Sequence, residues 1–392
     1  MNVLKNRDRL TQLVFGQFTS AATVYFGVFA VLPVFLIGHT TLKTSTIATV
    51  LFAASVMGKL GRVFVSSAID RLPLRNVLVL SSLTAAAALC ILPHLKNAAA
   101  ICTAITIFNL ANGANSVSVR SLTANMKRTT ESRFLKYSKL STATNFAAMI
   151  GPPAAFYLLT AANGMSPFYA FALLLAATAA AVFGFRSLIP DLHPQETIVS
   201  GVFYCLRLPE LRRLLICTSI GYFSYAFMYN SVALYATYHL RLENWGGVLL
   251  GLNAVIVIAT SYPLNQWMER MHFGVGIRIQ LGFGLYLVAF LLPVLLKHPV
   301  MLAVAVVLWA LAESSLLPSL IGQATVGVPA SRHVAALTVY SVVVGIGEGA
   351  GAFVAVSLTA SSALDGGAGF LLAAGICATA LLTSGPLLKG MV

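Results

Sequence analysis

Two glutamates, Glu313 and Glu348, lie in the middle of long apolar runs. An ionisable side chain at the centre of a bilayer costs about 2.5–3.5 kcal/mol on insertion scales, so each one requires a reason. Because burial disfavours a charged carboxyl, a bound proton is the simplest way to keep a glutamate there. We predict that one or both are proton-coupling residues, carrying a proton that is exchanged for cargo. The alternative is a protonated glutamate that only hydrogen-bonds a neighbouring helix.

Basic side chains also occur inside apolar runs, in the first half of the chain. Lys59 and Arg62 are three residues apart, hence on one helix face, and Arg120 lies at a similar depth to Arg62. We predict that Lys59 and Arg62 line a positively charged half-cavity that prefers anionic or zwitterionic cargo. The alternative, favoured for Arg120, is that these long side chains reach the membrane interface or bridge helices.

Neutral polar side chains form stripes at helical spacing. Asparagines repeat every three residues within 99–122, and tyrosines repeat every three or four within 214–238. From these stripes and the helix at 138–160, the predicted cavity residues are Asn112, Asn145, Tyr225 and Tyr229. Asparagines can instead hold helices together by hydrogen bonds, and aromatic stripes often only pack.

Two further segments have the residue types of a conformational gate. Asp70 lies at a helix end, where it can pair with Arg71 or Arg75 and hold one side of the molecule closed in one state. In 138–160, Gly151 is followed by Pro152 and Pro153, which supply no backbone N–H, so this segment favours a bend. We predict Asp70, Arg71, Arg75, Gly151 and Pro152 as gating residues, and a charge cluster that only sets topology is the alternative for the first three.

Signatures of nucleotide, cofactor and metal chemistry are missing from the sequence. There is no phosphate-binding glycine loop, no dinucleotide fingerprint and no metal-ligand spacing among the seven histidines. The five cysteines lie singly and do not form a zinc or disulfide framework. We therefore expect no cofactor, no metal and no catalytic residues, and predict that the chain is not an enzyme.

The composition identifies the solvent that surrounds these residues. Of 392 residues, 58% are hydrophobic and only 9% are charged, and the mean hydropathy is +0.86, whereas soluble domains carry roughly 25% charged residues. The net charge of +14 comes from basic clusters between apolar spans rather than from one soluble face. A lipid bilayer, and not nucleic acid, is the predicted partner.

Twelve membrane-spanning helices account for the apolar runs. The predicted spans are 12–38, 46–67, 76–95, 99–122, 138–160, 167–187, 214–238, 247–267, 277–296, 300–322, 334–358 and 366–388. The first run is too long for a signal-peptide core, so we expect it to remain in the mature protein. Most basic residues fall in alternate loops, and the other loops contain only Lys43, Lys96, Arg241 and Lys297. The positive-inside rule then places both termini in the cytoplasm, in a multi-pass protein of the inner membrane.

The chain divides into two similar halves in this prediction. A six-helix bundle at 1–187 is followed by a proline-containing cytoplasmic linker at 188–213 and a second six-helix bundle at 214–392. Gly151 recurs as Gly351, and Gly113 corresponds to Glu313, each at a shift of 200 residues. A weak echo of this length is typical of two parallel repeats.

Three segments resemble the major facilitator superfamily. The stretch 66–75 is similar to the family's loop signature, with Ser66 and Pro73 in place of its glycines. The stretch around Gly151 and Pro152 resembles the motif of its proton-driven exporters, with alanines replacing the outer glycines, and 345–351 resembles a glycine-rich helix of many bacterial members. Asn109 stands where drug exporters often have an arginine. The resemblance implies an all-α membrane fold of two six-helix bundles around a midplane cavity.

We therefore expect a secondary active transporter that works by alternating access, functional as a monomer. The favoured activity is proton-coupled export of a small polar, anionic or zwitterionic metabolite, siderophore or drug. A proton-coupled importer of an organic anion or amino-acid derivative uses the same parts and stays open as an alternative. A membrane enzyme or receptor would need a catalytic cluster or a sensing domain, and the sequence contains neither.

Overall fold

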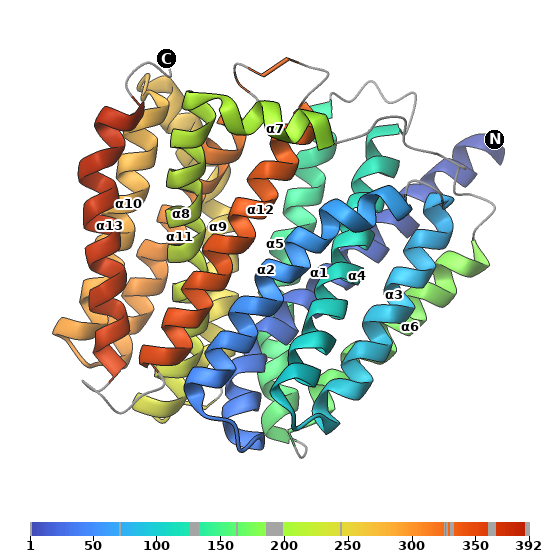
Figure 1. Cartoon of the computed structure of the whole chain (residues 1–392), viewed down its shortest axis with the longest axis horizontal. Coiled ribbons are helices and arrows are strands. Elements are labelled where there is room, and N and C mark those ends of the chain that lie inside the picture. Colours follow the sequence, from blue (N-terminus) through green and yellow to red (C-terminus); the bar gives the residue numbers. More distant parts are fainter. Residues whose placement is uncertain are drawn as a thin grey trace. The chain divides into compact units, whose positions relative to one another are not determined.

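Long helices make up almost all of the described chain (Figure 1). The computed structural model describes residues 2–69, 72–125, 133–161, 164–185, 199–243, 245–324, 326, 328–329, 333–359 and 366–388. These residues form thirteen α-helices and no β-strand. The predicted all-α class is confirmed.

The first six helices coincide with the first six predicted spans. They are α1 (Asn2–His39), α2 (Thr44–Ile69), α3 (Leu74–Ile91), α4 (Ala98–Asn125), α5 (Arg133–Ala161) and α6 (Ser166–Gly184). A short 3-10 turn, η1 (Leu92–His94), follows α3. The helix α5 stays helical through Pro152 and Pro153, although both prolines lack a backbone donor.

The remaining predicted spans also form helices, and one extra helix precedes them. They are α7 (Val199–Arg207), α8 (Pro209–Leu234), α9 (Trp245–Arg270), α10 (Val275–Leu295), α11 (Pro299–Gln323), α12 (His333–Val354) and α13 (Gly367–Leu388). The π-helical turns η3 (Tyr235–His239) and η5 (Ala355–Thr359) extend α8 and α12. Only α7 has no counterpart among the twelve predicted spans, and it lies in the predicted linker.

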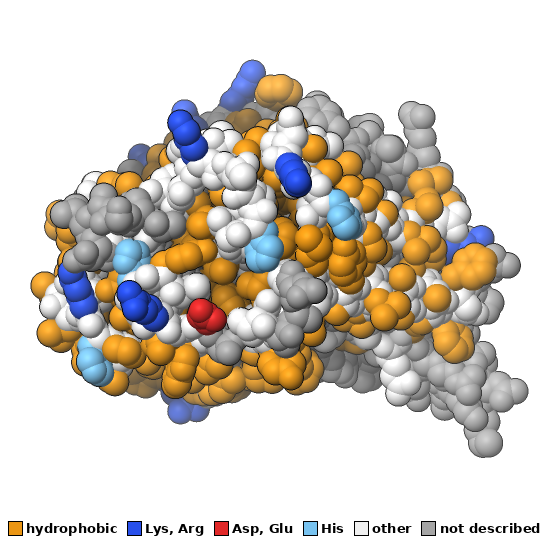
Figure 2. Space-filling model, turned by 90° about the horizontal axis from the view of Figure 1, so that it is seen from below, with side chains coloured by type: hydrophobic (Ala, Val, Ile, Leu, Met, Phe, Trp, Pro, Cys, Tyr) orange, Lys and Arg blue, Asp and Glu red, His pale blue; other side chains and the backbone are white. Residues whose placement is uncertain are grey.

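The outer surfaces of the helices suit a lipid environment. Nine helices of the described chain are long and apolar enough to cross a membrane. Large apolar side chains point outward, with Leu173 and Tyr262 each 72% exposed and Leu382 78% exposed. Lipid tails cover such side chains at no hydrophobic cost. Figure 2 looks onto one end of the helices instead, where basic and histidine side chains lie singly among apolar atoms.

Contacts within the chain define two compact units. The N-terminal unit contains Met1–Leu32 and Met57–Glu196, and the C-terminal unit contains Pro33–Val56 and Thr197–Val392. In the N-terminal unit, α3 packs against α4 and α6; in the C-terminal unit, α12 packs on α8 and α10 packs on α11 and α13. The division into 1–187, 188–213 and 214–392 stays a prediction.

The 200-residue echo in the sequence reappears as a repeated backbone contact. A β-carbon added at Gly151 of α5 would meet the carbonyl oxygen of Thr23 and the nitrogen of Gly27 on α1. A β-carbon at Gly351 of α12 would meet the same two atoms of Phe223 and Phe227 on α8. In each unit, two helices therefore come into close contact at a glycine. The contact is possible because glycine has no side chain.

Candidate substrate and proton site

Glu313 lies in the middle of α11, inside the C-terminal unit. Its side chain is half-buried, and the oxygen Oε2 is shielded from solvent without a hydrogen-bond partner in the described chain. Trp309, one turn earlier, is fully buried, and its indole nitrogen also lacks a hydrogen bond. No described basic side chain forms an ion pair with Glu313. Its carboxyl therefore has unused capacity for a proton or a cation.

Two other helices bring polar groups to Glu313. Asn253 of α9 is 6% exposed and is its polar neighbour, although the amide nitrogen does not reach hydrogen-bonding geometry. Tyr286 of α10 is fully buried and close enough to interact electrostatically with Glu313, and its hydroxyl neighbours the Trp309 indole without a formal hydrogen bond. The helices α9, α10 and α11 thus place polar groups around the carboxyl, and a small movement would bring them into hydrogen-bonding distance of it.

The tyrosine stripe predicted on α8 faces the same place. The ring centres of Tyr225 and Tyr229 lie 6.0 Å and 6.3 Å from that of Trp309, and 6.0 Å from each other. Tyr225 is half-buried, whereas Tyr229 is buried. Both predicted cavity tyrosines therefore belong to an aromatic group one turn from Glu313, where ring faces can attract a cation.

The second predicted proton-coupling residue belongs to the same cluster. Glu348 is half-buried on α12 and interacts electrostatically with Tyr340, two turns earlier on that helix. The hydroxyl of Tyr340 donates to the hydroxyl of Tyr222 on α8 over 3.3 Å. Tyr222 in turn packs edge-on against Tyr225, with ring centres 6.3 Å apart. Both glutamates therefore lie in one cluster of tyrosines within one unit.

A hydrogen-bonded clasp between α9 and α11 positions the segment that carries Glu313. Pro318 has no backbone N–H, so the carbonyl of Ser314, four residues earlier, loses its helical partner. The side-chain amide of Asn265 donates to that carbonyl over 2.9 Å and to the carbonyl of Ser261 over 2.6 Å. The hydroxyl of Ser261 also donates to the Ser314 hydroxyl over 3.1 Å. The break in α11 is thus held by a neighbouring helix.

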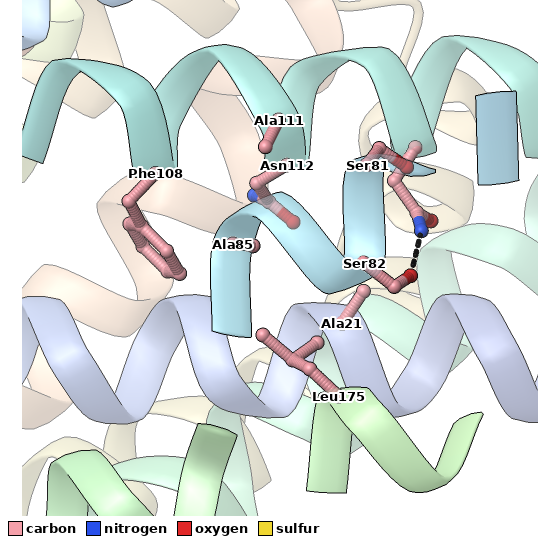
Figure 3. Close-up of a pocket in the computed structure, with 9 residues that line it drawn as sticks. Ala21, Ser81, Ser82, Ala85, Phe108, Ala111, Asn112 and Leu175 are labelled. Atoms are coloured by element: carbon pink, nitrogen blue, oxygen red, sulfur yellow. Dashed lines mark hydrogen bonds between the residues drawn. The ribbon is translucent and has the colours of Figure 1, made fainter. Parts of the chain in front are cut away.

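The N-terminal unit has a small cavity between α1, α3, α4 and α6, lined by apolar side chains together with serines and asparagines (Figure 3). Its volume is about 10 Å³, and Asn112 points into it from α4. The hydroxyl of Ser82 accepts hydrogen bonds from Gln17 over 2.6 Å and from Asn115 over 3.0 Å. Of the predicted cavity residues, Asn112 alone lines this cavity, which holds no more than one water-sized molecule.

The remaining predicted cavity residues are not collected around Asn112. Lys59 is half-buried on α2 and has interactions of its own, and Asn145 is half-buried on α5. The backbone of Arg62 continues α2, but its side chain lies outside the described residues. The basic half-cavity therefore stays a prediction.

Three of the predicted gating residues are described. Asp70 and Arg71 lie outside the described residues, and Arg75 is half-buried in the first turn of α3. Gly151 and Pro152 are buried in α5, where Gly151 makes the close contact with α1. Their roles as gates stay predictions.

Four members of the glutamate cluster were not predicted from the sequence. They are Asn253, Tyr286, Trp309 and Tyr340. A signal existed for two of them, since Asn253 is a lone amide in an apolar run and Trp309 lies four residues before Glu313, on the same helix face. Nothing in the sequence distinguishes Tyr286 and Tyr340 from tyrosines that face lipid.

Comparisons with known proteins agree with this architecture. Residues 13–352 match the family model described as Major Facilitator Superfamily. A POT family transporter in complex with a thioalcohol conjugated peptide is 12% identical, with a TM-score of 0.75 over 97% of this chain and 96% of that one. The nucleoside transporter NupG is 14% identical, with a TM-score of 0.75 over 98% and 99%. The peptide transporter POT in complex with sulfate is 16% identical, with a TM-score of 0.75 over 97% and 96%. Likeness at this identity shows the fold, and a search of curated proteins finds no match.

Proposed function

This chain belongs to the Major Facilitator Superfamily, and on that premise we propose that it is a proton-coupled secondary transporter of a small molecule. Cargo crosses the membrane by alternating access, and Glu313 carries the exchanged proton. One observation carries the proposal: a membrane-embedded carboxyl oxygen that is shielded from solvent and has no partner in the described chain.

The surroundings of Glu313 explain how a proton and a cargo molecule become coupled. A carboxylate removed from water is costly unless a proton or a cation compensates its charge. No described basic side chain pairs with Glu313, so a proton or a cationic group of the cargo can supply the compensating charge. A proton then leaves when a cationic group of the cargo takes its place, and this exchange links the two flows.

The interior charges of each unit support a zwitterionic cargo. Away from the ends of the apolar spans, the charged residues of the first half are basic, and Lys59 is the one whose side chain is described, whereas those of the second half are Glu313 and Glu348. The described basic residues of the second half, Arg278 among them, lie near helix ends or in loops. An ammonium group suits a carboxyl beside aromatic rings, and an anionic group suits a lysine.

The solved relatives suggest the first compounds to test. POT family transporters are described in complex with a thioalcohol conjugated peptide and with 5-aminolevulinic acid. Peptides and amino acids carry the two charges inferred above. Polar metabolites, siderophores and drugs of the same charge pattern complete the panel.

Export is the proposed direction, from a monomer in the inner membrane with both termini in the cytoplasm. The support is the resemblance of the segment around Gly151 and Pro152 to the motif of proton-driven exporters. Uptake of an organic anion or amino-acid derivative is the alternative.

The direction can be tested in oriented inside-out vesicles that contain the purified protein. Uptake of labelled compounds from the panel is measured under two conditions. In one the vesicle interior is more acidic than the medium, and in the other the medium is more acidic than the interior. Export by exchange predicts accumulation in vesicles that are acidic inside. Accumulation that requires acid outside and follows the protons inward would support uptake by symport and contradict export.

A further inference from the structure

The helix α7 (Val199–Arg207) lies across the ends of α8 and α12 rather than along them (Figure 1). Pro209 begins α8, and the residue before it, Leu208, is extended with φ −74° and ψ 117°. A residue that precedes proline is disfavoured in helical geometry, so α7 ends there and the chain changes direction. On its inner face, Cys205 is fully buried.

The outward face of α7 is apolar where a water-exposed helix would be polar. Phe203 is 64% exposed and Leu206 is 43% exposed. Arg207 is exposed as well and shares their face, because residues three and four apart are neighbours on a helix. Two large apolar side chains beside an arginine are typical of a helix that lies in the membrane interface.

The first turns of α8 show the depth at which α7 lies. Arg212 and Arg213 are exposed, and Ile216, one turn further, is 52% exposed. The outward face of α8 thus changes from basic to apolar within one helical turn, a rise of about 5.4 Å. A change of this kind is typical of the boundary between lipid headgroups and hydrocarbon, and from it we infer that α7 lies at the headgroup level.

We propose that this surface, here called the α7 face, binds anionic phospholipid headgroups of the cytoplasmic leaflet. The α7 face consists of Phe203, Leu206, Arg207, Arg212 and Arg213. The arginines bind the lipid phosphate, and the two apolar side chains insert among the upper acyl carbons. Glu210 is the only acidic residue of 199–216, and no described carboxylate forms an ion pair with the three arginines. A free phosphate ion would contact the arginines and leave the apolar side chains without a partner, whereas a lipid contacts both the arginines and the apolar side chains.

The test uses the full-length protein in a neutral detergent, with Phe203→Trp as a fluorescent reporter. A short-chain phosphatidylglycerol is titrated and the change in tryptophan emission is recorded. Removing two arginines by Arg212→Gln and Arg213→Gln should raise the half-saturating concentration roughly 25-fold, since a basic residue at an anionic surface contributes about 1 kcal/mol, a factor of about five. The control removes the same charge through Lys43→Gln and Arg241→Gln, both exposed in loops on the predicted opposite side of the membrane.

Saturable binding of phosphatidylglycerol that the arginine variant weakens and the control variant retains would support the α7 face. Equal binding of short-chain phosphatidylcholine, or an arginine variant that binds as well as its parent, would overturn it. Inorganic phosphate that saturates the same signal at the same concentration would replace the lipid site with a simple anion site. None of these outcomes depends on the cargo or on Glu313, so they leave the transport proposal to its own test.

Discussion

Replacing Gly351 by alanine should separate α12 from α8. The added β-carbon would lie 2.7 Å from the backbone nitrogen of Phe227 and closer still to the carbonyl oxygen of Phe223. Real β-carbons essentially never come this close, and a backbone atom inside a helix cannot turn away as a side-chain tip can. The two helices therefore have to move apart along a large contact.

Two opposing terms determine the size of the effect. Alanine is favoured over glycine inside a helix by about 0.8–1.0 kcal/mol, whereas overpacking a well-packed interior costs typically 1–3 kcal/mol. We expect Gly351→Ala to destabilise the protein by a net of up to about 2 kcal/mol. Gly347→Ala, one turn away, meets the backbone of Ser219 and Phe223 in the same way. The double variant should cost less than the sum, because one displacement relieves both contacts.

Gly375→Ala provides the matched control. Gly375 is exposed on α13, and a β-carbon there meets no atom within 4 Å. This change retains the helix-propensity gain without the clash, so it should leave stability unchanged or raise it by up to about 1 kcal/mol.

Thermal unfolding of the wild type and the four purified variants in one detergent, at one scan rate, measures the effect. The midpoint should fall for Gly351→Ala and stay or rise for Gly375→Ala. Equal midpoints for the two variants would refute the close packing of α12 on α8 described above.

Two further predictions concern the surroundings of the proposed site. Asn265→Leu leaves the carbonyl of Ser314 without its side-chain donor, which should cost about 1–3 kcal/mol of stability. The control is Asn97→Ala, which removes a hydrogen bond at an exposed helix cap. An equal fall of the unfolding midpoint in the two variants would contradict the clasp. Lys59→Glu should weaken binding of zwitterionic cargo at least roughly tenfold, since a hydrogen bond to a charged group contributes about 1.5–3 kcal/mol. Unchanged cargo affinity of Lys59→Glu in a titration would contradict the predicted basic half-cavity.

The sequence was sufficient for the spans because the bilayer imposes them. A membrane helix needs a long apolar run, and such a run is visible residue by residue. The same rule made Glu313 and Glu348 conspicuous, since an acidic residue in an apolar run is costly wherever it points. The echo between Gly151 and Gly351 was also visible, and the structure gives it a cause in the two matching helix contacts.

The partners of Glu313 could not be predicted in the same way. Whether Asn253 and Tyr286 face the carboxyl depends on the rotation of α9 and α10 about their axes, which small packing differences determine. The segment that forms α7 was predicted as a linker because nine residues are too few for a span. Pro209 was predicted only as a linker proline, whereas in the structure it begins α8 at the point where the chain turns.

Proton release on cargo binding tests the central role of Glu313 most directly. The purified protein is placed in weakly buffered detergent with a pH indicator, and the compound panel is added to wild type, Glu313→Gln and Glu243→Gln. Glu243 is exposed in a loop and controls for the loss of one carboxylate. The account predicts proton release from wild type and Glu243→Gln, and none from Glu313→Gln although it still binds cargo. Undiminished proton release from Glu313→Gln would contradict it.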